Sequence, residues 1–297
     1  MLRYNLSMNL CADYSNMIKA WMQKNGVKSD KTGWDLWYDY FNLQKKTIRV
    51  RKRNVLFSKE FICPPKVQTG LNLLVNKFKD GENVTPHLSK QALNPSKFDE
   101  LLYDWGIYHF HLGKANFNTD RIERTGPLLF ARIDDNNVYC INIYSHGKNV
   151  SPPWYKQEMI RIIHRNWPEI IEHWRLPDAV SANPKLTDQE YKQVRQNHLN
   201  TLIEVEEGVV YFSPGQGMSS SGHSSELVFL CDRIWNTLKK CELYIREHIL
   251  TFILAIQSNT GMLSDGKELY FKLWHENDNF YVIDIASQTA LLKVDLP

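Results

Sequence analysis

The chain has 297 residues, of which 43% are hydrophobic and 23% are charged, and its formal net charge is +3. This is the composition of an ordinary globular protein, and it excludes a chain that is disordered throughout. A nucleic-acid partner is compatible with such a small positive charge, but dedicated nucleic-acid-binding domains are usually more basic.

Cysteine usage and the apolar segments bear on the cellular compartment. No Cys-x-x-Cys pair occurs among the five scattered cysteines, Cys11, Cys63, Cys140, Cys231 and Cys241. This pattern argues against a zinc knuckle and against a disulfide framework. The first residues lack a charged segment followed by a long apolar run, and the longest apolar stretch, 249–256, is too short to span a bilayer. We therefore expect a cytoplasmic protein with reduced thiols and no membrane partner.

Two early segments, 7–25 and 66–79, have apolar residues at helical spacing and are predicted to be helices. Gly81 follows the second segment as a suitable C-cap. Between the two helices, residues 47–57 alternate basic and apolar side chains, which predicts strands.

A basic strip, defined as residues 45–53, carries six positive charges and no negative one. One interpretation is a solvated strand edge, where Lys and Arg discourage pairing with other chains. The other is a surface that contacts phosphate groups. In that second interpretation the nucleic-acid-binding residues are Arg49, Arg51, Lys52 and Arg53.

The centre of the chain is predicted to form a short helix at 98–105 and a two-histidine strand at 107–112. Two further strands, 128–133 and 138–144, follow this strand. The connection between them reads Asp-Asp-Asn-Asn, and these residues tolerate left-handed backbone conformations. The two strands should therefore pair as an antiparallel hairpin.

A helix over 154–174, kinked or divided at Pro168, precedes the best linker candidate, residues 176–186. The linker candidate is polar, contains two prolines and lacks periodicity. Beyond it the pattern predicts helices at 188–198 and 227–241, strands near 201–205 and 208–212, and two or three strands in 268–295. We expect an α+β fold with a largely antiparallel sheet packed by helices, organised as an N-terminal domain (1–175) and a C-terminal lobe (187–297).

Alternate residues of a strand point to the same side, so both histidines of strand 107–112 share one face. In strand 138–144 the predicted apolar face comprises Tyr139, Ile141 and Ile143. The opposite, polar face comprises Asn142, Tyr144 and His146. If the two strands belong to one sheet, a group suited to acid–base catalysis near neutral pH comes together: His109, His111, Tyr144 and His146.

Three interpretations of this group are open. In the first interpretation, the histidines have a structural role on a half-exposed face of the sheet. In the second, His109, His111 and His146 bind a divalent metal together with an Asp or Glu. In the third, the histidines transfer protons during metal-free phosphodiester cleavage, and arginines stabilise the charge on phosphorus.

The run from His109 through Arg124-Thr-Gly-Pro-Leu-Leu-Phe-Ala-Arg132 to His146 resembles the sheet of the RelE-like ribonuclease toxins. In that family a helix precedes a strand with a basic residue, and a strand with an arginine, an acidic turn and a closing strand follow. The resemblance covers residues 98–147. This chain departs from the family in being about three times as long as a toxin, which is small for even one average domain.

The resemblance implies roles for individual residues. His111 would occupy the first basic site, and Arg124 or Arg132 the phosphate-stabilising site. His146 would be the terminal acid or base. The strand pattern, not the resemblance, adds Tyr144 and His109 to the catalytic candidates, with His109 orienting or binding the substrate, and Arg132 is also a candidate nucleic-acid-binding residue. The implied reaction needs no metal and no other cofactor.

A Gly/Ser loop at 213–223 precedes a predicted helix, where backbone N–H groups can bind a phosphate. The candidate phosphate-binding residues of this loop are Gly217, Ser219, Ser220, Gly222 and His223. The loop lacks the Lys-Ser/Thr ending of a P-loop, so nucleotide hydrolysis of that class is not expected. A flexible loop with a Ser or Gly N-cap is the alternative interpretation.

The leading hypothesis is a nucleic-acid-directed protein, a metal-independent ribonuclease of toxin or defence type that interacts with RNA and with a protein partner or inhibitor. One alternative is a non-enzymatic binding or regulatory protein that uses the polar sheet face. The other is a metal-dependent hydrolase built on His109, His111 and His146.

Overall fold

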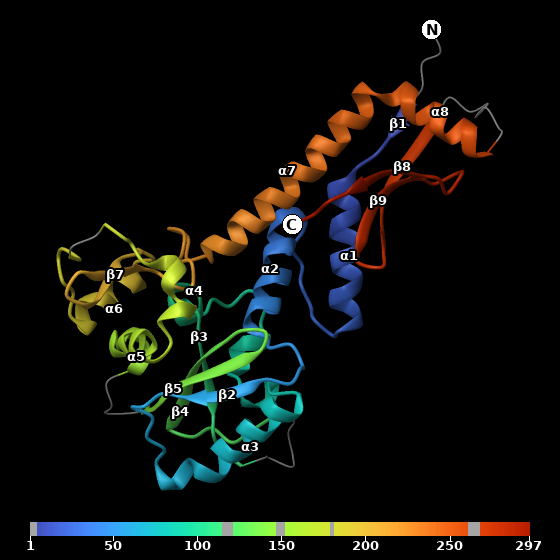
Figure 1. Ribbon diagram of the computed structural model, residues 1–297. Helices are drawn as coiled ribbons and strands as arrows, with labels where there is room; N and C mark the ends of the chain where they lie inside the picture. The colour runs from blue at the N-terminus through green and yellow to red at the C-terminus, as the bar shows by residue number, and fades with distance from the viewer. Residues whose placement is uncertain (1–4, 115–120, 147–151, 179–180, 261–267) are drawn as a thin grey trace. The chain divides into compact units, whose positions relative to one another are not determined.

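The computed structural model describes residues 5–114, 121–146, 152–178, 181–260 and 268–297. The helices are α1 Leu10–Lys24, α2 Gly33–Lys46, α3 Gln68–Asp80, α4 Glu100–Trp105, α5 Glu158–Asn166, α6 Asp188–Gln196, α7 Ser225–Glu247 and α8 Ile249–Thr260. The strands are β1 Asn5–Ser7, β2 Asn54–Phe57, β3 Ile107–His111, β4 Pro127–Ile133, β5 Asn137–Ser145, β6 Leu202–Glu206, β7 Val209–Phe212, β8 Glu268–Glu276, β9 Asn279–Asp284 and β10 Ala290–Val294. The expected α+β class with helix-packed sheets is confirmed (Figure 1).

The chain divides into two compact units, and each has its own core. Unit 1 comprises Met1–Phe41 and Leu227–Pro297, and unit 2 comprises Asn42–Glu226. This division differs from the predicted boundary at 176–186, which lies inside unit 2. The backbone N–H of Leu176 donates to the Val210 carbonyl at 2.9 Å, and the Leu186 carbonyl accepts from the Gln157 side chain at 2.8 Å. These bonds fix both ends of the segment within unit 2, so it does not act as a linker there.

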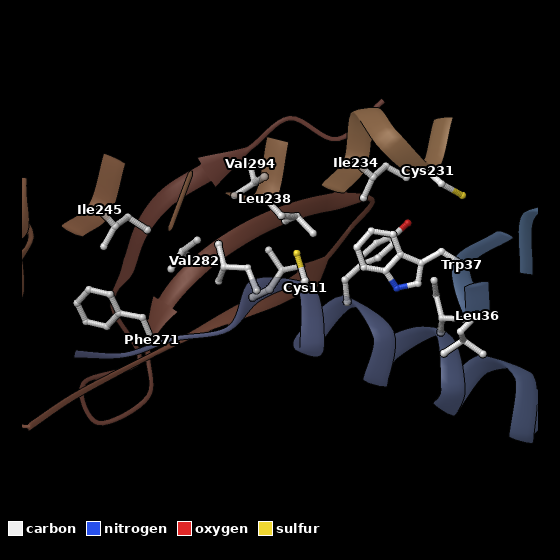
Figure 2. Close-up of a cluster of buried hydrophobic side chains, with 14 of the residues drawn as sticks. Cys11, Leu36, Trp37, Cys231, Ile234, Leu238, Ile245, Phe271, Val282 and Val294 are labelled. Atoms are coloured by element: carbon white, nitrogen blue, oxygen red, sulfur yellow. The ribbon is translucent and has the colours of Figure 1, made fainter. Parts of the chain in front are cut away.

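Unit 1 joins the two ends of the described chain in one sheet, ordered β1-β8-β9-β10, with β1 parallel to β8. Its core combines residues from α1 and α2 with residues from α7 and the last strands, as Figure 2 shows for Cys11, Trp37, Ile234, Leu238 and Val282. The Glu242 carboxylate accepts from the Leu10 N–H at 2.7 Å and so satisfies a free donor at the start of α1.

Unit 2 contains a mixed sheet ordered β2-β5-β4-β3 and a two-stranded sheet of β6 and β7. On one face, Leu71, Leu74 and Phe78 of α3 pack against residues such as Phe110 and Leu129. On the other face, the apolar side of α5 packs against Phe130 and Ile141 together with residues of β6 and β7. The four-stranded sheet is therefore a central layer between helices, and β3 lies at its edge.

One β-bulge changes the predicted side-chain pattern of β5. The register between β4 and β5 shifts between Phe130 and Ala131. Because of this extra residue, Ile141 lies in the core cluster on the α5 side, whereas Ile143 lies in the cluster on the α3 side. The prediction that Tyr139, Ile141 and Ile143 share one face is therefore wrong.

Three local predictions also differ from the structure. The helix predicted over 154–174 ends at Asn166, and two single 3₁₀ turns follow, because Pro168 cannot donate the next helical hydrogen bond. The short central helix begins at Glu100 with Asp99 as its N-cap. Of the strands predicted in 47–57, only β2 forms.

Among the residues that the structure describes, no helix combines the length and apolar character that crossing a membrane requires.

Candidate functional site

Strand β4 lies between the two strands that carry the candidate catalytic residues. His111 of β3 is opposite Leu128, which is in turn opposite Tyr144 of β5. Cross-strand partners share a face, and neighbouring strands are about 4.8 Å apart. His111 and Tyr144 therefore lie on the same face of the sheet with one strand between them.

Trp154, in the 3₁₀ turn Pro153–Tyr155, brings two of the histidines to a common surface. Its ring centroid lies 4.8 Å from that of His109 and 5.7 Å from that of His146. The same indole contacts Phe130 at 5.4 Å. The sheet and this tryptophan thus place the histidines of β3 and His146, just after β5, on one side of the sheet, although His146 itself is exposed.

His111 has a buried imidazole, and only 6% of the residue is exposed. Its Nδ1 atom is buried and has no hydrogen-bond partner among the described residues. Burial chiefly, together with electrostatic repulsion from the protonated forms of His109, Arg124, His146 and His87, lowers the pKa of His111 to about 4. The imidazole is therefore neutral at pH 7 and can accept a proton.

The neighbouring groups have shifted pKa values as well. Burial lowers the pKa of His109, and the Asp99 carboxylate partly opposes this shift. Burial also lowers the pKa of His87, whose Nδ1 lies 2.9 Å from the backbone oxygen of His111. The pKa of Tyr144 is raised to about 12, chiefly by burial, so its hydroxyl stays protonated near neutral pH.

A large cavity of about 1160 Å³, which we call the basic cavity, lies beside His111. Among the described residues that line it, four side chains are cationic and one is a carboxylate, that of Glu123; the cations are Lys77, Lys90, Arg121 and Arg124. Lys77 is paired with Glu82 at 2.8 Å. The Nη1 atom of Arg121 is buried without a partner among the described residues. An excess of positive charge around a neutral imidazole suits an anionic ligand.

Backbone hydrogen bonds hold the arginines of this cavity beside β3. The Ile122 N–H donates to the Pro86 carbonyl at 3.2 Å, and the Glu123 N–H donates to the Lys114 carbonyl at 2.9 Å. The Leu112 N–H donates to the Thr125 hydroxyl at 3.2 Å. These bonds fix the segment that carries Arg121 and Arg124 against the end of the histidine strand.

A second cavity of about 260 Å³, which we call the aromatic cavity, lies beside His109. Its lining includes Phe98, Trp154 and Tyr155, the carboxylates Asp99 and Glu100, and the cations Lys46 and Arg195. The two cavities share a wall. Strand β3 contributes His109 to one and His111 to the other, and the 3₁₀ turn Lys90–Leu93 contributes Gln91 to the aromatic cavity and Lys90 to the basic cavity.

The basic strip divides into exposed and structural residues. Arg49, Arg51 and Lys52 are exposed, and Arg51 is paired with Asp135 at 2.9 Å. Arg53 is buried, and its guanidinium donates to the Asp134 and Arg49 carbonyls at 2.8 and 2.9 Å. The prediction of Arg53 as a nucleic-acid contact is therefore corrected, because the side chain is buried and its donors bind backbone carbonyls, one of them in the turn between β4 and β5.

Arg132 also has a structural position. Its guanidinium donates to the carbonyl oxygens of Trp105 and Pro214 at 2.8 and 3.1 Å and lies 5.0 Å from the ring of Trp174. Burial lowers its pKa to about 10, which leaves it charged at neutral pH. Arg132 is thus no candidate for the phosphate-stabilising role, whereas Arg124 is exposed at the basic cavity beside His111.

The Gly/Ser loop uses its backbone donors within the protein. The N–H groups of Gly215 and Gly217 donate to the carbonyls of Asp104 and Tyr103 at 2.7 and 2.9 Å, and that of Gly222 donates to Ser219 at 2.9 Å. The His223 ring packs against Phe98 at 4.9 Å. The predicted phosphate site at Gly217, Ser219, Ser220, Gly222 and His223 is corrected, because the glycine donors that it requires are occupied. The loop instead packs against α4.

Sequence reasoning missed a buried ion pair that supports the site. The Arg195 Nε donates to an Asp104 carboxylate oxygen at 2.8 Å, and its Nη2 lies 2.7 Å from the same oxygen as an ion-pair contact; both residues are almost fully buried. Ser213 and Tyr191 donate to the same carboxylate at 2.8 and 2.9 Å. Arg195 also donates to the Trp154 carbonyl at 2.5 Å. No sequence signal links Asp104 and Arg195, because 91 positions separate them.

In the described part of the chain, no three His, Cys, Asp or Glu side chains are grouped so that they could bind a metal ion. His109, His111 and His146 are all described, so this finding removes the geometric basis of the predicted metal site.

No protein-family model, curated protein or solved structure matches this chain.

Proposed function

We propose that unit 2 binds RNA with its phosphate groups in the basic cavity and cleaves the phosphodiester bond without a metal. One observation carries this proposal: His111, whose buried Nδ1 has no hydrogen-bond partner among the described residues, lies in the wall of a cavity that Lys90, Arg121 and Arg124 also line. The resemblance of residues 98–147 to RelE-like ribonucleases supports the same residue, His111, from the sequence.

In the proposed reaction, neutral His111 accepts the proton of the ribose 2′-hydroxyl. The 2′-oxygen then forms a bond to phosphorus while the bond from phosphorus to the 5′-oxygen breaks. Arg124 and Arg121 stabilise the additional negative charge on the phosphoryl oxygens. The exposed His146 donates a proton to the departing 5′-oxygen. The products are a 2′,3′-cyclic phosphate and a 5′-hydroxyl, so atoms and charge balance.

The test measures RNA binding and RNA cleavage separately, in the presence of EDTA. We expect His111→Gln to lower the cleavage rate about a hundredfold or more while affinity changes little, because Gln cannot act as a base. We expect Arg124→Ala to weaken binding and to reduce its salt dependence by about one ion. His173→Gln, at an exposed position, is the matched control.

Cleavage that persists in His111→Gln, or that EDTA abolishes, would contradict the catalytic proposal. RNA that is bound but not cleaved would favour the non-enzymatic binding protein instead. No RNA binding at any salt concentration would remove the proposed function altogether.

We also infer a cytoplasmic location and a protein inhibitor as a further partner. The location agrees with the five cysteines, none of which is in a disulfide in the structure. The inhibitor rests on the toxin resemblance.

A further inference from the structure

The aromatic cavity differs chemically from the basic cavity beside it. Its cations are already engaged: Arg195 binds Asp104 and the Trp154 carbonyl, and Lys46 donates to the carbonyls of Asn94 and Lys97. They are therefore not available to a phosphate.

Several hydrogen-bond acceptors line the cavity and can meet a ligand. One Asp99 oxygen accepts from the Leu102 N–H at 3.1 Å as the N-cap of α4. Glu100, half-buried in the first turn of α4, lines the same cavity. The Nδ1 of His109 is buried and lacks a partner among the described residues. A ligand in this cavity needs two features. It must have N–H groups that donate to a carboxylate, and it must have a flat apolar part that packs against aromatic rings.

The position of the aromatic cavity next to the basic cavity further limits which ligands can occupy it. His109 and His111 are two residues apart on one strand face, so their Cα atoms are about 7 Å apart. A ligand that spans the shared wall would place its anionic part beside His111 and its flat part beside His109. One nucleotide combines these two parts, and proteins that bind single-stranded RNA commonly stack its splayed bases on aromatic side chains.

We propose that the aromatic cavity is a base-binding pocket, and that Glu100 selects a nucleobase with an exocyclic amino group over uracil. The proposal rests on the proposed function, because the phosphate of the same nucleotide occupies the basic cavity. Phe98, Trp154 and Tyr155 provide apolar ring surfaces, and the Glu100 carboxylate accepts from the amino group. Carboxylates accept from cytosine N4 in the same manner.

A quaternary or methylated ammonium ligand also binds aromatic pockets. The cations Lys46 and Arg195 line this cavity together with the carboxylates Asp99 and Glu100, so the charges of the lining balance and do not favour a permanent cation, whereas a neutral base is not repelled. The nucleobase is thus the occupant that fits both the lining and the neighbouring cavity.

The test compares the affinities of short single-stranded oligouridines with those of the same oligomers carrying one central adenosine, cytidine or guanosine. The inactive His111→Gln protein is used, so that the RNA stays intact. We expect at least one amino-bearing base to raise affinity about tenfold, and Glu100→Gln to remove most of this preference while oligouridine affinity stays within about threefold. Glu207→Gln, at an exposed carboxylate in the turn between β6 and β7, is the matched control and should keep the preference.

The outcomes separate the two proposals. Equal affinity for every central base, or a base preference that survives Glu100→Gln, would contradict the base-binding pocket. Neither result would contradict the phosphate site in the basic cavity. Displacement of RNA by free trimethyllysine would also contradict the base-binding pocket. Absence of binding to every oligomer would instead contradict the proposed function itself.

Discussion

At His111, burial and the positive charge of neighbouring groups both lower the pKa of the imidazole. Both disfavour the charged imidazolium, and together they lower its pKa from the ordinary value of 6.5 to about 4. A histidine with this pKa stays neutral over the whole physiological pH range. It is also a group whose titration affects stability, because an unfolded chain restores the ordinary pKa.

The first prediction concerns the pH dependence of stability. Between about pH 6.5 and pH 4 the unfolded state binds a proton at His111 that the folded state does not, so the free energy of unfolding falls as pH falls through this window. The loss from this group approaches about 3 kcal/mol at the lower end. The His111→Gln protein has no imidazole to titrate at this position, so its free energy of unfolding should decrease less than that of the unsubstituted protein as the pH falls.

The measurement is urea unfolding of both proteins at several pH values. At pH 7.5 the imidazole is neutral in both states, so the difference measured there isolates the packing effect of the substitution. Parallel stability curves for the two proteins from pH 7.5 to pH 4 would contradict the lowered pKa.

The second prediction concerns the buried pair of Asp104 and Arg195. Removal of one partner leaves the other charge buried without compensation, so Asp104→Asn should lower the free energy of unfolding by about 3–5 kcal/mol. It should also alter the environment of Trp154, whose carbonyl Arg195 binds, which tryptophan fluorescence can report.

The control for this pair is Lys185→Ala. It breaks the ion pair with Glu204 at 2.8 Å, in which the Lys185 side chain is 67% exposed, and should change stability by about 1 kcal/mol or less. Equal effects of the two substitutions would contradict the role assigned to the buried pair.

At the scale of elements, the approach of α3 to the end of β3 depends on a glycine. A Cβ atom at Gly70 would lie 1.9 Å from the carbonyl oxygen of Leu112, directly after the histidine strand. The helix must move away if this position carries a side chain. Leu73 and Lys77, which line the basic cavity, would move with it.

The third prediction is that Gly70→Ala lowers the free energy of unfolding by about 1–3 kcal/mol and also weakens RNA binding. The steric clash outweighs the higher helix propensity of alanine. Asn76→Ala, at an exposed position of the same helix, is the control and should be neutral or slightly stabilising. A stable Gly70→Ala protein with normal RNA affinity would contradict this account of the packing.

Most elements of the site were predictable because their periodicity is strong. The two-histidine strand and the hairpin of β4 and β5 form as the alternation and the Asp-Asp-Asn-Asn turn indicate. The bulge at Ile141 was not predictable, since one inserted residue has no composition signal. The prediction for the basic strip was wrong at Arg53 for a related reason, because the sequence does not reveal that its guanidinium binds the Asp134 carbonyl, 81 positions away.

At the scale of the whole molecule, the segments of unit 1 are separated in the chain by the whole of unit 2. The polar segment 176–186, which contains two prolines, was predicted to be a domain boundary. The boundaries between compact units are instead defined by which residues contact each other in space. The real boundaries fall within α2 and α7, where helical periodicity continues without interruption. No local pattern could have located them.

The fourth prediction follows from the separate cores of the two units. A fragment of residues 42–226 contains all the residues of the buried clusters around the central sheet, so it should fold cooperatively and bind RNA. A fragment of residues 1–226 should be less soluble, because it exposes Leu10, Tyr14 and Ile18 of α1 without the core residues from 227–297. Circular dichroism and sedimentation test both fragments, and an unfolded 42–226 fragment would contradict the prediction.

The parallel pairing of β1 with β8 has a consequence for synthesis on the ribosome. Asn5 pairs with Glu268, so β1 is synthesised long before its partner strand β8. Unit 2 is continuous and can fold as it emerges, whereas the amphipathic α1 must remain without its core during that time. A chaperone that shields an emerging apolar helix would therefore act on the first forty or so residues, and the demand for it would end when the last strands leave the exit tunnel.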